Sequence, residues 1–197
     1  MILSDWASIS HGATLSRIEC RSFDDSVQLP LYTMKTMHDC LGIQTSNDSA
    51  EEQIVQVERR KASDLPVSNE RMVLMNLTSH QAAAIQSEHA GKVITSNFAI
   101  IEPSHFLDPM YLEWYLNEHP DCKKQLLIAT QGSRIAALSI KLLRSLPIQL
   151  PSIETQRRIG CTYKLMQRKK KLINKRLYLE EKVMKQLALQ QLKGEQT

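Results

Sequence analysis

The last forty-odd residues carry the clearest hydrophobic pattern in the chain. Between Ser152 and Lys193 the only residue that disfavours a helix is Gly160, so the sequence predicts one uninterrupted helix. At about 1.5 Å per residue this helix would be roughly 60 Å long, which is more than the small preceding body can cover. We therefore expect it to project from the body and to need a partner.

Apolar residues follow this predicted helix in two neighbouring stripes. The first alternates steps of four and three residues, as the contact seam of a coiled coil does, and the second lies beside it. The first stripe contains Ile159, Tyr163, Met166, Ile173, Leu177, Met184 and Leu187, and the second contains Leu165, Leu172, Leu179 and Val183. Lys170 and Glu180 interrupt the first stripe. Such a helix can pack on its own domain and on another helix at once, and a simple dimerisation coiled coil is the alternative interpretation.

The preceding residues predict an irregular, strand-rich body with helices late in the sequence. Predicted strands or extended segments are Leu15–Cys20, Leu29–Met34, Gln53–Glu58, Arg71–Leu77, Lys92–Glu102 and Leu146–Leu150, with a loop at Thr45–Glu52 and a turn at Gln131–Ser133. Predicted helices are Met110–His119 after Asp108-Pro109, Pro120–Leu127, a short one capped by Ser139, and the long one capped by Ser152. This order is not a repeating βαβ pattern. The prediction is an α+β protein with one body at residues 1–151 and, at residues 152–197, a helix for dimerisation and partner docking.

Charge is distributed very unevenly along the chain. The 197 residues carry a formal net charge of +4, yet residues 157–197 hold 12 basic and 3 acidic side chains, whereas residues 1–156 hold 13 basic and 18 acidic ones. An excess of this size in the helix indicates a nearby polyanion or an acidic protein surface.

The sequence contains little that predicts catalysis by this chain alone. Cys20, Cys40, Cys122 and Cys161 are widely spaced without a CxxC pair, and the chain has no phosphate-binding loop or nucleophile motif. We therefore expect no enzyme activity, metal or cofactor. No run approaches 18 apolar residues and the first residues do not resemble a signal peptide, so we expect no membrane association and a cytoplasmic location.

Several motifs, in their order and spacing, resemble a known family. They are Ser96–Phe98, Leu107–Leu112 with Tyr115–Leu116, Gln131–Arg134, Leu146–Pro151 and Glu154–Ile159, and the opening Ile9–Arg17 is similar as well. Together they resemble the target-recognition domain and adjoining helix of specificity (S) subunits of type I restriction-modification systems. The match is thin between Asp24 and Glu88.

The resemblance implies a DNA-binding function. Such subunits bind double-stranded DNA sequence-specifically and bring a DNA methyltransferase (modification) subunit, and in some systems a restriction subunit, to their target. They usually carry two recognition domains separated by long antiparallel helices, whereas this chain has one domain and one helix. It could thus be a half-subunit that reads a bipartite site as a homodimer. It could also be a truncated remnant or a coiled-coil scaffold that no longer binds DNA.

Candidate contact residues follow from the chemistry of each interface. Base edges and phosphates are read by basic and amide side chains on turns and strand ends. The DNA-binding candidates are Arg17, Arg21, Lys92, Asn97, Gln131, Ser133 and Arg134, and those for the dimer or partner helix are Ile159, Met166, Ile173, Leu177, Met184 and Leu187. For each DNA candidate, an ordinary solvated side chain is the alternative. The acidic balance of the body argues against a strong electrostatic footprint there, and the basic helix can supply what the body lacks.

Overall fold

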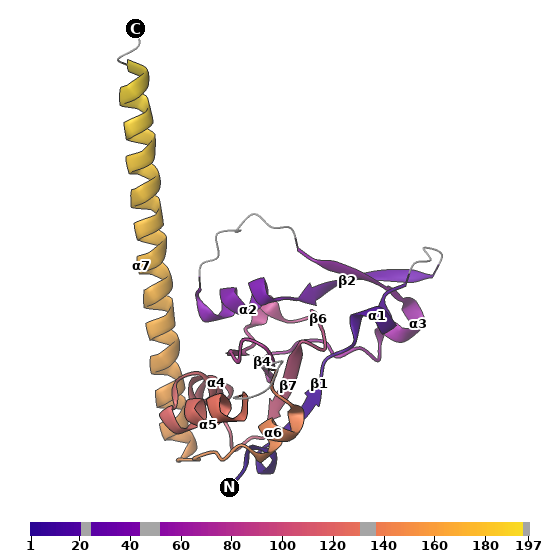
Figure 1. Cartoon of the computed structure of the whole chain (residues 1–197). Coiled ribbons are helices and arrows are strands. Elements are labelled where there is room, and N and C mark those ends of the chain that lie inside the picture. The colour runs from indigo at the N-terminus through magenta and orange to yellow at the C-terminus, as the bar shows by residue number, and fades with distance from the viewer. Residues whose placement is uncertain (21–24, 44–51, 131–136, 195–197) are drawn as a thin grey trace.

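The computed structural model describes residues 1–20, 25–43, 52–130 and 137–194, and it shows a strand-rich body from which one long helix projects (Figure 1). The strands are β1 (Ala7–His11), β2 (Ser26–Tyr32), β3 (Ile54–Glu58), β4 (Val73–Asn76), β5 (Ala82–Ala84), β6 (Val93–Ile94) and β7 (Phe98–Pro103). The α-helices are α1 (Leu15–Ile18), α2 (Met34–Leu41), α3 (Arg59–Ala62), α4 (Pro109–Glu118), α5 (Pro120–Thr130), α6 (Ile140–Ser145) and α7 (Ile153–Gly194), and the 3-10 helices are η1 (Leu3–Asp5) and η2 (Ser87–His89). The predicted α+β class, with a strand-rich body followed by a long helix, is confirmed.

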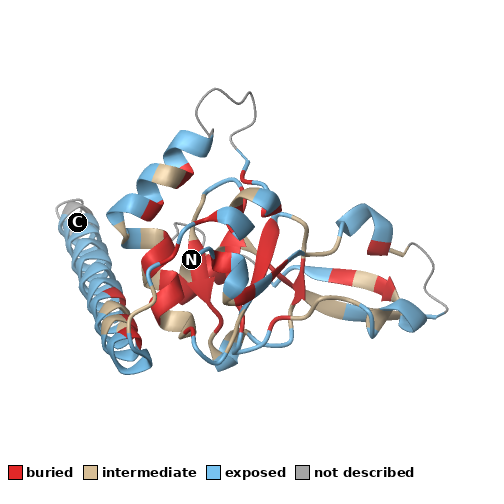
Figure 2. Ribbon diagram, turned by 90° about the horizontal axis from the view of Figure 1, so that it is seen from below, coloured by how far each residue is buried: buried red, intermediate tan, exposed pale blue. Residues whose placement is uncertain are grey.

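A four-stranded antiparallel sheet in the order β1-β7-β4-β5 forms the centre of the body. Val73 and Met75 of β4 pack with α4, α5 and α6 on one face, whereas Leu74 between them packs with α2 on the other. Because helices cover both faces, β4 is apolar at successive positions and does not alternate. Figure 2 shows the buried residues concentrated in this layer and along the foot of α7, most of which is exposed.

The second sheet has three strands in the order β3-β2-β6 and extends away from α7 (Figure 1). Strand β2 pairs with β3 from Ser26 to Pro30 and then with β6 from Leu31 to Tyr32. Pro30, which has no N–H to donate, lies where β2 changes partners. Beyond that point β2 and β3 continue as a two-stranded ribbon with α1 and α3 at its far end (Figure 1).

Three predicted segments have a different structure. Lys92–Glu102 is divided into β6 and β7, which belong to different sheets, because the chain turns at Thr95 where its carbonyl accepts from Phe98 N at 3.0 Å. Leu15–Cys20 begins as the one-turn helix α1, which buries Ile18, and only then pairs with β3. Leu146–Leu150 makes only an isolated bridge, because Pro147 cannot donate to a ladder.

Other elements agree with the prediction or were missed. The strands around β3 and β4 are confirmed, as are the caps of α4 by Asp108 and of α6 by Ser139. The predicted strand from Leu29 begins earlier, and Met34 already starts α2, which was not predicted. Strand β1 was also missed, as was β5, whose three alanines give no local strand signal. The loop at Thr45–Glu52, apart from Glu52, and the turn at Gln131–Ser133 lie outside the described residues.

The projecting helix is anchored by a very close crossing with α4. A Cβ atom on Gly160 would lie 2.8 Å from the Met110 carbonyl carbon and 2.8 Å from the Tyr111 nitrogen. These are backbone atoms, so no rotamer change could relieve the overlap. Gly160 therefore permits a backbone-to-backbone approach that any side chain would prevent.

Gln156, one turn earlier, fixes the same end of α7. Its side chain is almost fully buried and donates to the Phe106 and Pro151 carbonyls at 3.0 and 2.9 Å. Its carbonyl oxygen accepts from Asp108 N at 2.9 Å. Because these bonds join α7 to the start of α4, Gln156 sets where the helix leaves the body.

Gly160→Ala should destabilise the protein even though alanine is the better helix former. We expect a net loss of about 1 to 3 kcal/mol in the free energy of unfolding, because the new methyl group meets backbone atoms of α4. Denaturant unfolding followed by circular dichroism would measure it. The matched control is Cys161→Ala at the next, exposed position, which should change stability little. A Gly160→Ala protein as stable as the parent would show that α4 and α7 do not cross this closely.

Candidate nucleic-acid and partner interfaces

Two side chains from α4 form hydrogen bonds with the free edge of strand β5. Asn117 donates to the Ala82 carbonyl at 2.7 Å and accepts from Ala82 N at 2.9 Å. Glu113, one turn earlier on α4, accepts from Ala84 N at 2.8 Å. The outward-facing N–H groups of the edge strand are thereby satisfied, and α4 is held at a fixed position against the sheet.

Glu113 also holds α7. Its side chain is completely buried, and Lys164 Nζ lies 2.6 Å from the same carboxylate oxygen that accepts from Ala84. Gln167 Nε2 donates to the other oxygen at 3.0 Å. One buried carboxylate therefore links β5, α4 and α7, and its charge is balanced by a lysine from the projecting helix.

Two further contacts complete the junction. The Tyr163 hydroxyl donates to Glu118 at 3.4 Å, and burial raises the pKa of Tyr163 to about 12. On the other side, α2 ends at Gly42, whose left-handed backbone (φ 69°) brings it against α7. A Cβ atom there would lie 3.2 Å from the Gln167 carbonyl oxygen. These contacts between the described part of the body and α7 lie between Gln156 and Lys171.

Beyond its junction with the body, α7 is exposed. Every residue from Arg168 to Gln191 is exposed. Of the predicted interface residues, Ile159 is half-buried and packs on the core of its own body. The others are exposed to between 47% and 67%: Met166, Ile173, Leu177, Met184 and Leu187. An uncovered apolar seam of this length is typical of a surface that binds another chain.

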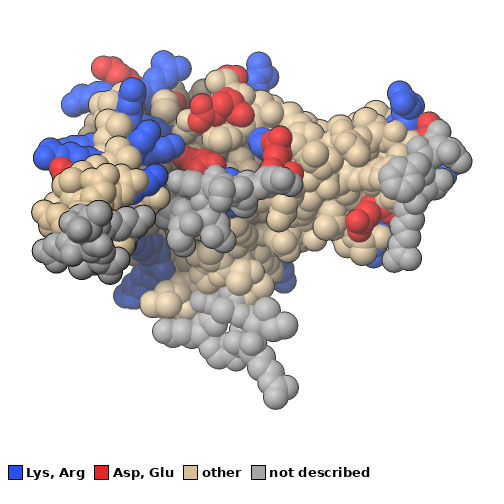
Figure 3. Space-filling view, turned by 90° about the horizontal axis from the view of Figure 1, so that it is seen from above, with Lys and Arg blue, Asp and Glu red and all other residues tan. Residues whose placement is uncertain are grey.

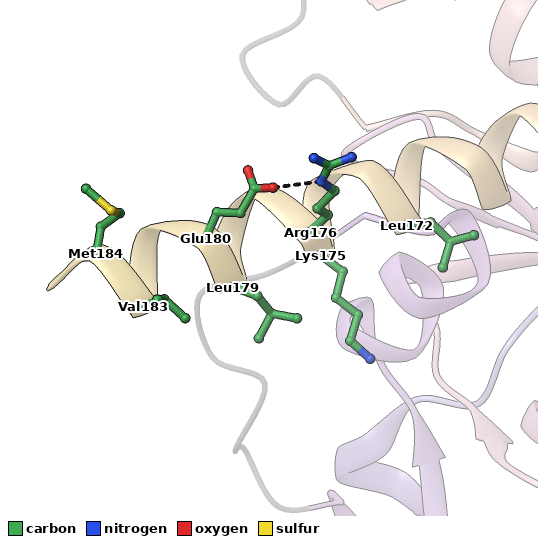
Figure 4. A pocket seen from close by; sticks show the side chains of 7 residues that line it. All are labelled: Leu172, Lys175, Arg176, Leu179, Glu180, Val183 and Met184. Carbon is green, nitrogen blue, oxygen red and sulfur yellow. Dashed lines mark hydrogen bonds and ion pairs between the residues drawn. The ribbon is translucent and has the colours of Figure 1, made fainter. Parts of the chain in front are cut away.

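The second apolar stripe lies on a neighbouring side of the same exposed helix. Figure 4 shows Leu172, Leu179 and Val183 pointing to one side, while Met184 points to the other with the ion pair between Arg176 Nε and Glu180, which measures 2.7 Å. The two stripes give the distal half of α7 more apolar surface than one seam requires.

The basic run of α7 lies on this exposed half. It consists of Arg168, Lys169, Lys170, Lys171, Lys175 and Arg176. Only Arg176 forms an ion pair with another residue that the structure describes. Figure 3, which looks down on the C-terminal end of α7, shows Lys and Arg side chains gathered around the helix. This is the strongest candidate in the described chain for contact with a polyanion.

The predicted DNA-binding residues are only partly brought together. Arg17 on α1 and Asn97 between β6 and β7 are exposed, and their segments adjoin because Ala13 pairs with Thr95. Lys92 precedes β6, and its side chain is only 15% exposed and ion-paired with Glu52. Arg21, Gln131, Ser133 and Arg134 lie outside the described residues.

The far end of the ribbon carries basic residues that are not among the predicted DNA-binding residues. Arg59, Arg60 and Lys61 form α3 and are exposed, but Glu58 pairs with Arg60 at 2.8 Å and with Lys61 at 3.3 Å. Asp25 lies 3.6 Å from Arg59. The run of three basic residues directly after a strand was a visible signal. Because neighbouring acids neutralise much of it, it adds little net positive charge.

No metal site or membrane span is found among the residues that the structure describes. They contain no group of three or more His, Cys, Asp or Glu side chains arranged to hold a metal ion. None of their helices is both long enough and apolar enough to cross a bilayer.

Comparison with solved structures finds chains with a similar fold. A chain from a structure of the type I R-M system, determined for its complex assembly and conformational transition, matches 93% of this chain with a TM-score of 0.55 at 18% identity. The HsdS subunit from Thermoanaerobacter tengcongensis matches 90% of it with a TM-score of 0.51 at 18% identity. The chain has an S-subunit-like fold. It spans 41% and 39% of the length of those two chains. No protein-family model matches the sequence, and comparison with curated proteins finds no match.

Residues of the resembling motifs hold the body and α7 together. Tyr111 and Tyr115 of α4 donate from their hydroxyl groups to the carbonyls of Gln149 and Pro147 at 2.7 and 3.3 Å. Together with Gln156, these side chains join α4, the 146–151 segment and the foot of α7. These three motif residues therefore help to build the junction between body and helix. The residues predicted to read DNA lie on other segments: Arg17, Asn97, Gln131, Ser133 and Arg134 belong to the remaining motifs, and Arg21 and Lys92 lie outside them.

Glu113→Gln should destabilise the body–helix junction strongly. The amide keeps the shape of the side chain but leaves Lys164 as a buried cation without its counter-charge, so we expect a loss of roughly 3 to 5 kcal/mol. Denaturant unfolding would measure this change.

A double-mutant cycle with Lys164→Met provides the control for Glu113→Gln. The double variant should be more stable than the two single effects predict, because it removes both charges. The exposed pair of Lys123 and Glu118, 3.9 Å apart, is the matched surface case, and Lys123→Met should cost less than about 1 kcal/mol. Strictly additive effects at Glu113 and Lys164 would contradict the ion pair.

Proposed function

We propose that this chain is a sequence-specific DNA-binding specificity subunit of a type I restriction-modification DNA methyltransferase complex, and that it reads a bipartite site as a dimer. The S-subunit-like fold carries the proposal. The chain covers about two fifths of each solved relative and comprises one body and one long helix. A two-fold dimer would then present two identical bodies in opposite directions, as two inverted half-sites require.

The surface of α7 supports the same function in a second way. Its apolar seam is uncovered, and its basic run is exposed beside that seam. A dimer or a partner helix would cover the apolar residues, while the lysines and arginines stay available for phosphates or for an acidic partner surface. The division of charge between body and helix makes α7 the main electrostatic attraction for DNA.

In this proposal the chain contributes recognition and not chemistry. The partners are double-stranded DNA, a modification subunit that holds the methyl donor, and in a complete system a restriction subunit. No cofactor is assigned to this chain. Arg17 and Asn97 are the described DNA candidates that remain well exposed, and Arg21, Gln131, Ser133 and Arg134 remain candidates from the sequence.

A scaffold function is the second candidate, and a specific observation favours it. Lys92, Arg59, Arg60 and Lys61 all pair with nearby acids, so these four side chains are less available for phosphates. A truncated remnant with this body could still dimerise or dock a partner through α7. Salt-dependent binding to duplex DNA, measured with and without a modification subunit, separates the two functions.

The purified chain should transfer no methyl group from S-adenosylmethionine to DNA on its own. When it is added to a matching modification subunit, target-dependent transfer should appear, because recognition and chemistry are on separate chains. Incorporation of labelled methyl groups into duplex DNA measures this. Transfer by the isolated chain would contradict the assignment, as would a modification subunit that is equally active without it.

Arg134→Ala and charge reversal on α7 should weaken DNA binding in different ways. If Arg134 meets a base edge, its loss should cost about 1 to 3 kcal/mol on the preferred sequence and little on random DNA. The variant with Lys169→Glu and Lys175→Glu should weaken binding to all DNA alike and flatten the salt slope. Binding titrations at several salt concentrations measure both.

Each variant tests one assignment and leaves the other assignment unaffected. Equal losses on both kinds of DNA would demote Arg134 to a backbone contact. Unchanged DNA binding by the α7 variant would leave its basic run to a protein partner.

A further inference from the structure

The exposed seam of α7 contains two charged residues at positions where a coiled coil is normally apolar. Lys170 and Glu180 fall on the same four-and-three spacing as Met166, Ile173 and Leu177. Both side chains are exposed in the single chain, and Glu180 uses one carboxylate oxygen for Arg176. Charges at core positions of a coiled coil cost stability but specify register and orientation.

An antiparallel pair of α7 helices has one register in which both charges are matched. When Ile173 of one copy faces Leu177 of the other, every seam position from Tyr163 to Leu187 faces another seam position. The facing pairs are Tyr163 with Leu187, Met166 with Met184, Ile173 with Leu177, and Lys170 with Glu180. By symmetry each pair occurs twice, so two Lys–Glu pairs form within an otherwise apolar seam.

Other registers leave these charges opposite apolar groups. A shift of one heptad in either direction places Lys170 against Ile173 or Leu187, and Glu180 against Tyr163 or Leu177. Each shift would bury two lysines and two glutamates without a counter-charge, which costs several kcal/mol. The apolar positions tolerate all three registers, so the charged residues decide between them.

A parallel pair is disfavoured for the same reason. In register it would place Lys170 against Lys170 and Glu180 against Glu180 at the centre of the seam. It would gain one type of exposed flanking pair, between Arg176 and the partner's Glu181. Exposed pairs contribute less than about 1 kcal/mol, whereas like charges facing each other in a core are strongly unfavourable.

The body offers a matching groove at the place where the partner's helix would end. Alongside the seam, a groove is lined by Ile43 after α2, Leu127 of α5 and Tyr163 of α7. Lys123, Lys124 and Lys170 line it as well, together with Glu118. Glu180 and Glu181 are the only acidic residues between Arg157 and Gly194. The antiparallel register brings this acidic pair of the partner to the groove with the three lysines.

We infer that the partner covering the distal half of α7 is a second copy of this chain, antiparallel, with Lys170 of each copy opposite Glu180 of the other. This register deepens the proposed function, because it specifies the two-fold dimer on which that function rests. It places Gly160 of the two copies about 45 Å apart along the helix pair. The bodies then lie at opposite ends of the pair, and the register of α7 sets their separation.

Charge exchange in the seam provides the first test. Lys170→Glu and Glu180→Lys should each weaken self-association by about tenfold or more, because each creates two like-charge contacts. The double variant should return to within about threefold of the parent, although the lysine introduced at position 180 would then lie beside Arg176. Sedimentation equilibrium measures the dissociation constant. The matched control is Lys175→Glu, on the outward side of the same helix, which should change self-association little.

Disulfide cross-linking tests the register directly. In a Cys161→Ser background, differently tagged chains with Met166→Cys and Met184→Cys should cross-link to each other. Met166→Cys mixed with Leu177→Cys reports the register shifted by one heptad, and Met166→Cys with itself reports the parallel pair. Neither of these should cross-link efficiently. All the substituted positions are exposed in the single chain, so the body should stay folded, and circular dichroism can check this.

The outcomes separate this inference from the DNA-binding proposal. A dimer that cross-links through the shifted or parallel pair, or a double charge variant as weak as the single ones, would reject the register alone. A parent protein that stays monomeric would reject both the register and two-fold reading. The expected cross-links in a protein that does not bind DNA would support the register and favour the scaffold function.

Discussion

The buried carboxylate of Glu113 is the interaction on which the architecture of this protein depends. It accepts hydrogen bonds from the edge strand β5 and from Gln167 of α7, it stands on α4, and it neutralises Lys164. A buried charge tolerates little displacement of its partners, because every lost contact leaves a desolvated polar group behind. The direction of α7 relative to the sheet is therefore fixed by electrostatics as well as by shape. Gly160 and Gln156 add the close approach and the hydrogen bonds that fix where the helix leaves the body.

This junction divides α7 into two parts with different tasks. Up to Gln167 the helix packs on its own body, and its buried positions there are Gln156, Gly160 and Gln167. Beyond that point its apolar stripes are exposed and its net charge is positive. A helix that is fixed at one end and exposed along the rest is consistent with the proposed dimer, in which two bodies are held at a set separation. A flexible attachment would lose that separation.

The motifs that resemble S subunits contain two groups of residues, those that build the junction and those predicted to read DNA. Tyr111, Tyr115 and Gln156 build the junction, and their positions are set by hydrogen bonds to backbone groups. Such contacts depend on the fold and not on the DNA sequence being read. The β2–β3 ribbon lies within the stretch where the resemblance is thin. Our candidates for recognition therefore fall on the turn carrying Asn97, on α1 and on segments outside the described residues.

The sequence by itself determined the features that depend on neighbouring residues. The helices after Asp108 and Ser139 could be predicted, because a capping side chain satisfies N–H groups only two or three residues away. The length of α7, its seam and its excess charge could also be predicted, because they depend on residues that are neighbours in the sequence. All seven DNA-binding candidates, and the dimer itself, remain predictions.

Only the tertiary structure decided what depends on residues far apart in the sequence. It divided Lys92–Glu102 between two sheets, made a strand of the alanines in β5, and paired Lys92 with Glu52. It also decided which turns of α7 face the body, because that depends on Glu113, more than fifty residues before the exposed half of the helix. Helix periodicity shows which residues share a face, but long-range burial and charge pairing determine which face is covered.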